Sequence, residues 1–245
     1  LLEYLEHSPP ADVISLTNSL LSGIAPEIRR RLGKPVVCSL QGEESFLAAI
    51  PEPHRSQAIG LLRENARAVD RFLAPYEEYA REMAELLDVP ASRVGVVRPG
   101  IEAAAYRREG PPPGGAFTIG YLSVIQPAKG LDVLADAFIL LVKERARDAR
   151  LVVAGKVMNR GYFRRVRDRL AAAGILSRVE FPGEVDFPGK RDFLRRCHAF
   201  CVPSRIRETR GMVFLEAMAA GVPVVAPAAG ILPDLLARTG GGVLA

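Results

Sequence analysis

The chain has 245 residues, which is enough for one large domain or two modest ones. Hydrophobic residues make up 49% of it and charged residues 25%, fractions that exclude a disordered chain, a collagen and a coiled coil. The 33 Lys and Arg against 28 Asp and Glu give a net charge of +5, which favours anionic partners but lacks the clustered basic stripe of a nucleic-acid-binding protein. We therefore expect a globular protein that does not bind nucleic acid.

The first part of the chain alternates short β-rich runs with helical patterns, which is typical of a parallel α/β fold. The predicted strands cover residues 12–16, 35–40, 71–74 and 94–97, and the predicted helices cover 24–32, 55–69 and 77–87. These strands are apolar on both faces, so their sheet is expected to be parallel and buried.

The pattern breaks at residues 106–116. Residues 106–115 carry three consecutive prolines and three glycines, which is typical of a linker. The alternation then restarts, with predicted strands at 117–122, 151–154, 179–181, 199–202 and 222–225 and predicted helices at 131–144, 163–173, 191–196 and 213–220. The sequence thus predicts an α/β protein with two Rossmann-like, doubly wound parallel-sheet domains, residues 1–105 and 117–245, and ligands at the carboxyl ends of the strands.

Residue usage also bears on location and metal binding. Three cysteines are too few and odd in number for a disulfide framework, so we expect reduced thiols and a cytoplasmic protein. No run approaches about 18 uninterrupted apolar residues, and no signal-peptide pattern is visible. The three histidines have no zinc-ligand spacing, so no metal site is predicted.

One glycine-containing segment imitates a phosphate-binding loop. Residues 183–191 resemble a Walker A loop, but five residues instead of four separate Gly183 from Gly189, and Arg191 stands where Ser or Thr must hold Mg²⁺. A P-loop is therefore rejected, and a dehydrogenase lacks its glycine fingerprint. Two other strand-to-helix junctions remain as candidates.

At the first junction, Lys129 directly precedes a predicted helix. The positive end of the helix dipole disfavours a lysine there unless an anion lies between its ammonium and the helix amides; a solvated lysine is the alternative. At the second junction, Gly211 lets the backbone approach a ligand, and the first helix amides can bind a phosphate or a sugar hydroxyl.

Two acidic residues belong to the second junction. Glu216 lies among apolar neighbours, and a buried carboxylate needs partners such as the hydroxyl groups of a sugar or a ribose. Glu208 lies eight residues earlier, about 12 Å along a helix axis, which exceeds the roughly 5–9.5 Å of a glycoside hydrolase pair. The two carboxylates suit the two ends of a nucleotide sugar better.

Residues 208–225, which read ETRGMVFLEAMAAGVPVV, resemble the E-x7-E region of retaining GT-B glycosyltransferases of the family 4 type, the glycosyl transferases group 1. Residues 120–132 resemble the phosphate-contacting lysine loop of that family, and residues 97–101 resemble the end of its N-terminal domain. The resemblance covers nearly the whole chain and is strongest from residue 117 to residue 233.

The resemblance implies a hexosyltransferase that moves a sugar, with retention of configuration, from a nucleoside-diphosphate sugar to a hydroxyl acceptor. The acceptor would be a sugar, a glycan or a lipid-linked glycan, without metal or cofactor, and the enzyme would be cytoplasmic or peripheral at the inner face of the membrane. Carried over by position, Glu216 binds the donor ribose and Glu208 a hydroxyl of the transferred sugar. The diphosphate leaving group would be stabilised by Lys129 and by the amides of Gly211, Met212 and Val213.

The sequence departs from the family pattern at three places, one of which is Arg210, where the family commonly has Phe. The family has an arginine where Val124 stands, and Arg205 or Arg210 is a hypothetical substitute on the diphosphate. The family often has a histidine in the acceptor-side loop, where this sequence reads Gln41 and Gly42, and glutamine cannot act as an acid or base near neutral pH. Two alternatives stay open: a nucleotide-sugar-binding relative with impaired catalysis, and another GT-B enzyme such as an epimerase or a phosphorylase.

The two ends of the chain resemble cut ends. The chain begins at Leu1 instead of Met, and residues 241–245 form a strand-like run with nothing after it. Family members begin with further strands and end with further helices, so both domains are expected to be incomplete. Such a fragment would keep most of the donor site, lack part of the acceptor site and not turn over substrate by itself.

Overall fold

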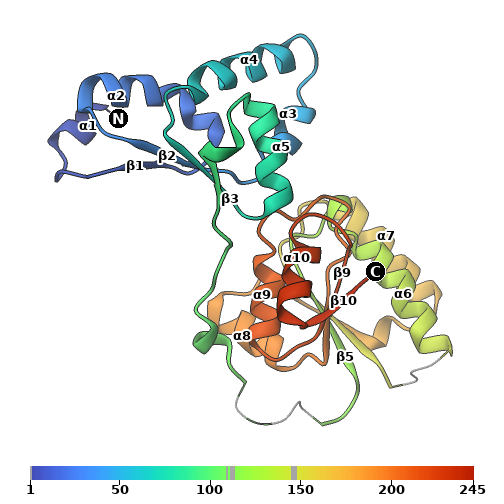
Figure 1. Ribbon diagram of the computed structural model, residues 1–245. Coiled ribbons are helices and arrows are strands. Elements are labelled where there is room, and N and C mark those ends of the chain that lie inside the picture. The colour runs from blue at the N-terminus through green and yellow to red at the C-terminus, as the bar shows by residue number, and fades with distance from the viewer. Residues whose placement is uncertain (1, 109, 111–113, 145–147) are drawn as a thin grey trace. The chain divides into compact units, whose positions relative to one another are not determined.

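The computed structural model (Figure 1) describes residues 2–108, 110, 114–144 and 148–245. The chain forms two compact units, Leu1–Pro99 and Gly100–Ala245. Among the described residues, no helix combines the length and the apolar character that a membrane span requires.

The first unit holds a four-stranded parallel sheet in the order β1-β2-β3-β4. Its strands are β1 (Ile14–Leu16), β2 (Val36–Ser39), β3 (Arg71–Ala74) and β4 (Val94–Val96). Its helices are α1 (Leu2–His7), α2 (Ala25–Leu32), α3 (Glu43–Ala48), α4 (His54–Ala66) and α5 (Glu77–Leu87), with 3₁₀ turns at Ser19–Ile24 and Ala91–Arg93. The predicted strand 71–74 and helix 77–87 are confirmed to the residue, whereas α1 and α3 are not in the prediction.

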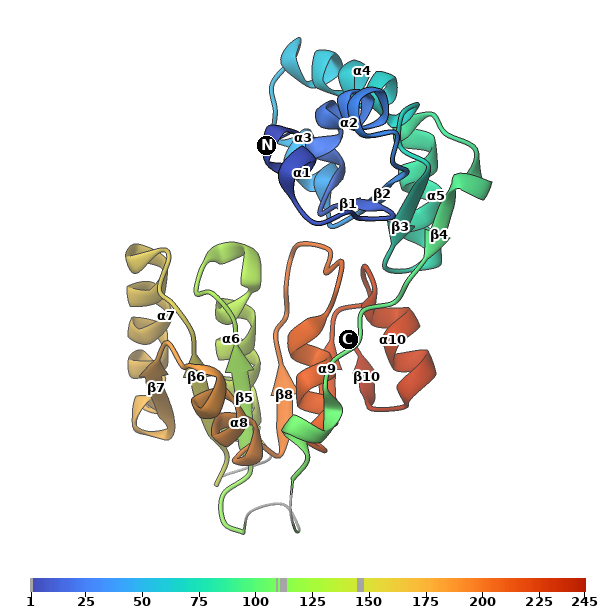
Figure 2. The same cartoon turned by 90° about the vertical axis from the view of Figure 1, so that its left-hand side faces the viewer.

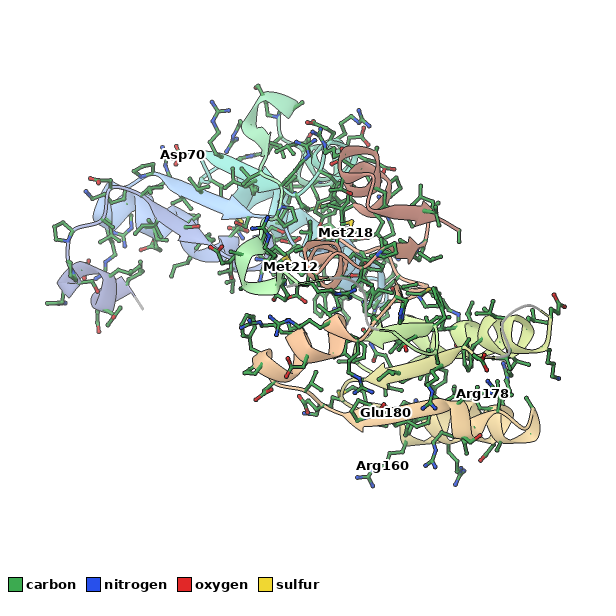
Figure 3. All side chains as sticks on the ribbon, turned by 90° about the horizontal axis from the view of Figure 1, so that it is seen from below. Asp70, Arg160, Arg178, Glu180, Met212 and Met218 are labelled. Carbon is green, nitrogen blue, oxygen red and sulfur yellow. The ribbon has the colours of Figure 1, made fainter. Side chains whose placement is uncertain are left out.

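The sheet of the first unit has a buried centre and a polar tie at one end. Cys38 of β2 and Phe72 of β3 are fully buried, as the apolar runs of these strands predict, and Met83 of α5 is buried with them. Asp70, labelled in Figure 3, directly precedes β3 and accepts hydrogen bonds from the Val36 amide at 2.7 Å and from the Arg29 guanidinium at 2.6 Å. These bonds join the starts of β2 and β3 to α2.

The second unit holds a six-stranded parallel sheet in the order β10-β9-β8-β5-β6-β7. Figure 2 shows β7, β6, β5 and β8 side by side in this order. The strands are β5 (Thr118–Leu122), β6 (Arg150–Ala154), β7 (Val179–Gly183), β8 (Ala199–Cys201), β9 (Val224–Ala226) and β10 (Gly242–Leu244). The chain runs outward from β5 in one direction and then in the other, so the topological switch point lies between β5 and β8.

The helices of the second unit are α6 (Leu131–Glu144), α7 (Arg160–Ala172), α8 (Phe187–Arg195), α9 (Met212–Ala219) and α10 (Leu232–Thr239). In Figure 1, α6 and α7 lie on one side of this sheet, and α8, α9 and α10 lie on the other. This is the arrangement that right-handed crossovers produce when the strand order reverses. The predicted doubly wound sheet is therefore present in this unit.

Proline at helix starts explains the largest errors of the sequence prediction. Helix α8 begins at Phe187 instead of residue 191, and α10 was not predicted. Both carry a proline, Pro188 or Pro233, in the first turn, where the missing amide has no helical partner in any case. The strand-like run at the end of the chain is strand β10, which pairs with β9.

The predicted linker is placed too late in the chain. The boundary between the two units falls after Pro99, whereas the prediction puts it at residues 106–116. The 3₁₀ turn Ala103–Tyr106 belongs to the second unit, because Tyr106 is buried there and its hydroxyl hydrogen-bonds to Glu216. Residues 109 and 111–113 of the predicted linker lie outside the described residues.

Candidate functional site

Two loops meet at the switch point of the second sheet. The loop after β5 contains the 3₁₀ turn Pro127–Lys129, and the loop after β8 starts at Val202. The Arg205 amide donates to the Ala128 carbonyl at 2.8 Å, which joins the loops. Gly130 adopts φ +67°, and a Cβ there would come within 1.9 Å of the Pro203 carbonyl oxygen. Only glycine permits this close approach.

Replacing Gly130 with alanine is therefore expected to force the two loops apart. We expect the free energy of unfolding to fall by about 3 kcal/mol, from the positive φ and the steric clash together. Gly174→Ala is the matched control, because Gly174 has φ +73° but nothing within 4 Å of the added Cβ, so it should lose only about 1 kcal/mol. Urea unfolding of both variants measures the difference, and equal losses would contradict the contact.

The structure brings together two predicted site residues, Lys129 and Glu208. The Lys129 Nζ lies 2.5 Å from Glu208 Oε1, and the two side chains are 15% and 19% exposed. The backbone of Glu208 is held from the other side, because its carbonyl accepts the Ile231 amide at 2.9 Å. Gly230, at φ +64°, packs so closely on Glu208 that a Cβ would come within 2.3 Å of that carbonyl oxygen.

Helix α9 begins beside these residues, and its N-cap residue makes no side-chain hydrogen bond to the first amides. Its N-cap is Gly211 at φ +59°, which has no side chain to accept a hydrogen bond from the helix. The Gly211 carbonyl accepts hydrogen bonds from the Phe214 and Leu215 amides, so the backbone hydrogen bonds within the helix begin with the amide of Phe214. Met212, labelled in Figure 3, and Val213 occupy the first turn, where amides have no helical acceptor and can bind an anion.

Glu216 is buried one turn further into α9, as predicted, and it has two partners. Its Oε1 accepts the Tyr106 hydroxyl at 2.8 Å and lies 2.7 Å from the Lys190 Nζ. Burial lowers the pKa of Lys190, but the hydrogen bond to Glu216 and its charge outweigh burial and raise it overall. Burial, followed by Glu216, raises the pKa of Tyr106.

Sequence reasoning missed both partners of Glu216. Lys190 stands in the segment that was rejected as a Walker A loop, and Tyr106 was assigned to the linker. Their spacing from Glu216, 26 and 110 residues, carries no local pattern. An indirect signal was available, because a carboxylate among apolar neighbours requires a cation or donor somewhere in the fold.

Arg205 and Arg210, the two suggested substitutes for the family arginine that contacts the diphosphate, differ in their surroundings. Arg205 donates to both carboxylate oxygens of Asp132, at 2.8 and 2.7 Å, and to the Pro127 carbonyl at 2.6 Å. Arg210 is exposed, one residue before the N-cap of α9, and Val124 is 38% exposed on the loop after β5. Arg205 would have to leave Asp132 to reach a diphosphate.

Asp132 and Arg205 line a cavity of about 350 Å³. Its walls also include Tyr162, Arg165 and Arg169. The hydrogen bond from Arg205 holds the pKa of Asp132 well below its usual range against the opposing effect of burial, and Tyr162 contributes through a 2.6 Å hydrogen bond. In turn, the hydrogen bond to Asp132 raises the pKa of Arg205.

Replacing Asp132 with asparagine is expected to lower stability in a pH-dependent manner. A carboxyl group whose pKa is lowered in the folded state stabilises the protein above its unfolded pKa and loses this effect as the pH falls. We expect the variant to lose about 1 kcal/mol of unfolding free energy at pH 7, since the pair is partly exposed. The difference in unfolding free energy between the variant and the wild-type chain should become smaller below about pH 4. Urea unfolding at pH 7 and pH 3.5 tests this; a constant difference would contradict the assignment.

In the first unit, Gln41 and Gly42 follow β2; a buried carboxylate accepts the Gln41 amide, and the Tyr79 hydroxyl accepts the Gly42 amide at 2.8 Å. Glu43, which sequence reasoning missed, accepts the Gln41 amide at 2.6 Å, the Ser19 amide at 2.8 Å and the Tyr79 hydroxyl at 3.0 Å. The Gln41 side chain donates to the Thr17 carbonyl at 2.5 Å. These hydrogen bonds thus join the loops that follow β1 and β2. No cluster of three His, Cys, Asp or Glu side chains within the described ranges could hold a metal ion.

Residues 102–245 match the family model of the glycosyl transferases group 1, and the chain belongs to this family. It is 34% identical over 210 residues to a D-inositol 3-phosphate glycosyltransferase of Thermobispora bispora, an alignment that covers 79% of this chain and 48% of that protein. A second such glycosyltransferase, of Thermomonospora curvata, is 31% identical over 271 residues, covering 97% of this chain and 61% of that protein. The chain thus spans about half the length of the curated relatives that it matches.

The fold resembles that of solved structures, among them a UDP complex and a galactosyltransferase. Anabaena HepE in complex with UDP has a TM-score of 0.83 at 19% identity, covering 100% of this chain and 66% of that one. The lipopolysaccharide outer core galactosyltransferase WaaB has a TM-score of 0.71 at 18% identity, covering 100% and 64%. The predicted GT-B fold class, with two Rossmann-like parallel-sheet domains, is confirmed.

Proposed function

We propose that this chain carries the donor site of a retaining, family 4 type glycosyltransferase, which moves a sugar from a nucleoside-diphosphate sugar to a hydroxyl acceptor. One observation carries the proposal. At the switch point between β5 and β8, the Lys129–Glu208 pair lies beside the start of α9, the helix that also holds Glu216. A cation, free amides and two carboxylates at one edge of a Rossmann-like sheet match the parts of a nucleotide sugar.

Each group has one role in the proposed reaction. Glu216 accepts hydrogen bonds from the ribose, and Glu208 accepts one from a hydroxyl of the transferred sugar. As the glycosidic bond breaks, negative charge develops on the diphosphate, and Lys129 stabilises it. The amides of Gly211, Met212 and Val213 assist, and these fixed donors are aimed at the position where the charge appears.

The proposed charge stabilisation uses groups of the chain, without a metal or a cofactor. An ammonium group and helix amides supply the positive potential that a divalent cation supplies in other phosphoryl sites. In the structure, Glu208 neutralises the charge of Lys129. The charge of Lys129 therefore acts on a diphosphate only when the diphosphate takes the place of the Glu208 carboxylate beside the ammonium.

Donor and acceptor are proposed from the relatives and from the first unit. UDP and UDP-glucose are bound in HepE structures, so we propose a uridine-diphosphate sugar. The inositol phosphate named for the curated relatives favours the hydroxyl of a phosphorylated polyol as acceptor, on the side of Gln41 and Gly42. Such a reaction would occur in the cytoplasm or at the inner face of the membrane.

Calorimetric titration of the chain with UDP, GDP and ADP tests the proposal. We expect UDP to bind more tightly than GDP and ADP. UDP-glucose should bind at least as tightly as UDP, because Glu208 gains a sugar contact. A folded chain that binds none of the nucleotides would refute the donor site.

A second candidate is a relative that binds nucleotide sugars without transferring the sugar. It is favoured by Val124 at the position of a family arginine, by Gln41 at that of a histidine, and by the engagement of Arg205 with Asp132. Nucleotide binding combined with no release of UDP from UDP-glucose would support it, if the assay uses a protein of the same length as the curated relatives and includes inositol phosphate or water.

A further inference from the structure

Lys190 has no role in the proposed reaction, although it contacts Glu216, the residue proposed to bind the ribose. It lies in the first turns of α8, whose start is fixed by Asp186 through a 2.8 Å hydrogen bond from the Gly189 amide. From there its ammonium reaches α9 and lies 2.7 Å from Glu216 Oε1. The side chains of Lys190 and Glu216 are 25% and 10% exposed, so the pair is largely shielded from solvent.

Two aromatic rings hold the Lys190 ammonium in place. Its Nζ lies 6.0 Å from the ring centroid of Tyr106 and 5.8 Å from that of Phe187. The two rings pack edge to face, with centroids 5.7 Å apart. Cation–π attraction and this packing restrict the lysine to the position beside Glu216.

The contacts to Glu216 are asymmetric. Tyr106 and Lys190 both bond Oε1, and no described residue bonds Oε2. A carboxylate in a plane fixed by two donors on one oxygen presents the other oxygen in a defined direction. Removing Lys190 would leave the buried Glu216 side chain without the positive charge that lies 2.7 Å from its Oε1.

We propose that Lys190 is a positioning residue of the donor site, which holds the Glu216 carboxylate through Oε1 and directs Oε2 to the ribose hydroxyls of the nucleotide. Tyr106 supports the same orientation. The inference rests on the proposed role of Glu216 in ribose binding. It assigns Lys190 to the discrimination of ribose, which neither the family motif nor the Walker A comparison suggests.

The experiment compares UDP with 2′,3′-dideoxy-UDP, which lacks both ribose hydroxyls. Because hydrogen bonds to a charged acceptor are strong, the wild-type chain should bind UDP about tenfold or more tightly than the dideoxy analogue. Lys190→Met should reduce this ratio to about threefold or less, and Lys190→Arg, which keeps the positive charge, should retain most of it. Lys143→Met, which removes an exposed lysine at the end of α6, is the matched control and should leave the ratio unchanged.

The double variant Lys190→Met with Glu216→Gln separates positioning from a general structural effect. If Lys190 acts through Glu216, the double variant should have the same low ratio as Glu216→Gln alone. A purely structural role would weaken both ligands equally and leave the ratio intact. If Lys190→Met does not fold, Lys190→Gln, which keeps a hydrogen-bond donor without the charge, makes the same comparison.

The outcomes distinguish this inference from the proposed function. A normal ratio in Lys190→Met, together with a reduced ratio in Glu216→Gln, would overturn the role of Lys190 and leave the ribose assignment of Glu216 in place. Tighter UDP binding by Lys190→Met would overturn it as well, since Lys190 would then block the ribose. No preference for UDP in the wild-type chain would overturn the proposed ribose site and this inference with it.

Discussion

Replacing Lys129 with methionine is expected to weaken UDP binding by about 10- to 100-fold, the range of a hydrogen bond to a charged group, while uridine binding stays unchanged. The reason is that Lys129 is the cation proposed for the diphosphate, which uridine lacks. Calorimetric titration with both ligands measures the two affinities. Lys143→Met removes the same charge from the exposed end of α6 and should change neither.

Breaking the ion pair with Glu208 adds to the loss of UDP affinity that we expect for Lys129→Met. Without Lys129, the carboxylate of Glu208 remains at the site with only 19% exposure and no counter-charge 2.5 Å away, and it repels the diphosphate. The double variant Lys129→Met with Glu208→Gln should therefore recover part of the UDP affinity. If Lys129→Met weakens uridine and UDP equally, the phosphate assignment is wrong.

Replacing Glu208 with glutamine is expected to raise the affinity for UDP and to lower the preference for UDP-glucose over UDP. UDP binding should tighten by on the order of tenfold, because the diphosphate no longer competes with a carboxylate for Lys129. The advantage of UDP-glucose over UDP should fall, because Glu208 is the proposed partner of a sugar hydroxyl. Titration with UDP and UDP-glucose measures both effects.

The control for this variant is Glu144→Gln, which neutralises an exposed carboxylate at the end of α6. Its UDP affinity should equal that of the wild-type chain within about twofold, since distant surface charges are screened by salt. Unchanged or weaker UDP binding in Glu208→Gln would show that the ion pair with Lys129 does not compete with the diphosphate.

Local signals predicted the architecture where one helix or strand contained its own pattern. Helices α5 and α6 begin and end at the predicted residues, because their apolar residues recur at helical spacing over three or more turns. Where the pattern was short or began with proline, as in α3, α8 and α10, tertiary packing defined the element. The order of the strands, with the switch point between β5 and β8, is a property of the whole sheet.

The candidate site divides in the same way. Lys129, Glu208, Glu216 and the start of α9 were proposed from the sequence as site residues, because each belongs to a strand-to-helix junction whose residues are adjacent in the chain. The sequence also predicted that Glu216 is buried. It did not predict that Arg205 is engaged by Asp132 or that Glu43 holds the loop of Gln41.

The sequence by itself determined the α/β class, most elements and the two junctions, because hydrophobic periodicity and helix starts are local properties of the chain. Only the tertiary structure decided which side chains neutralise one another. Lys129 meets Glu208 across 79 residues, and Glu216 meets Lys190 across 26 residues and Tyr106 across 110. Such pairs form because strands distant in the chain become neighbours in the sheet, and burial then requires each charge to find a partner.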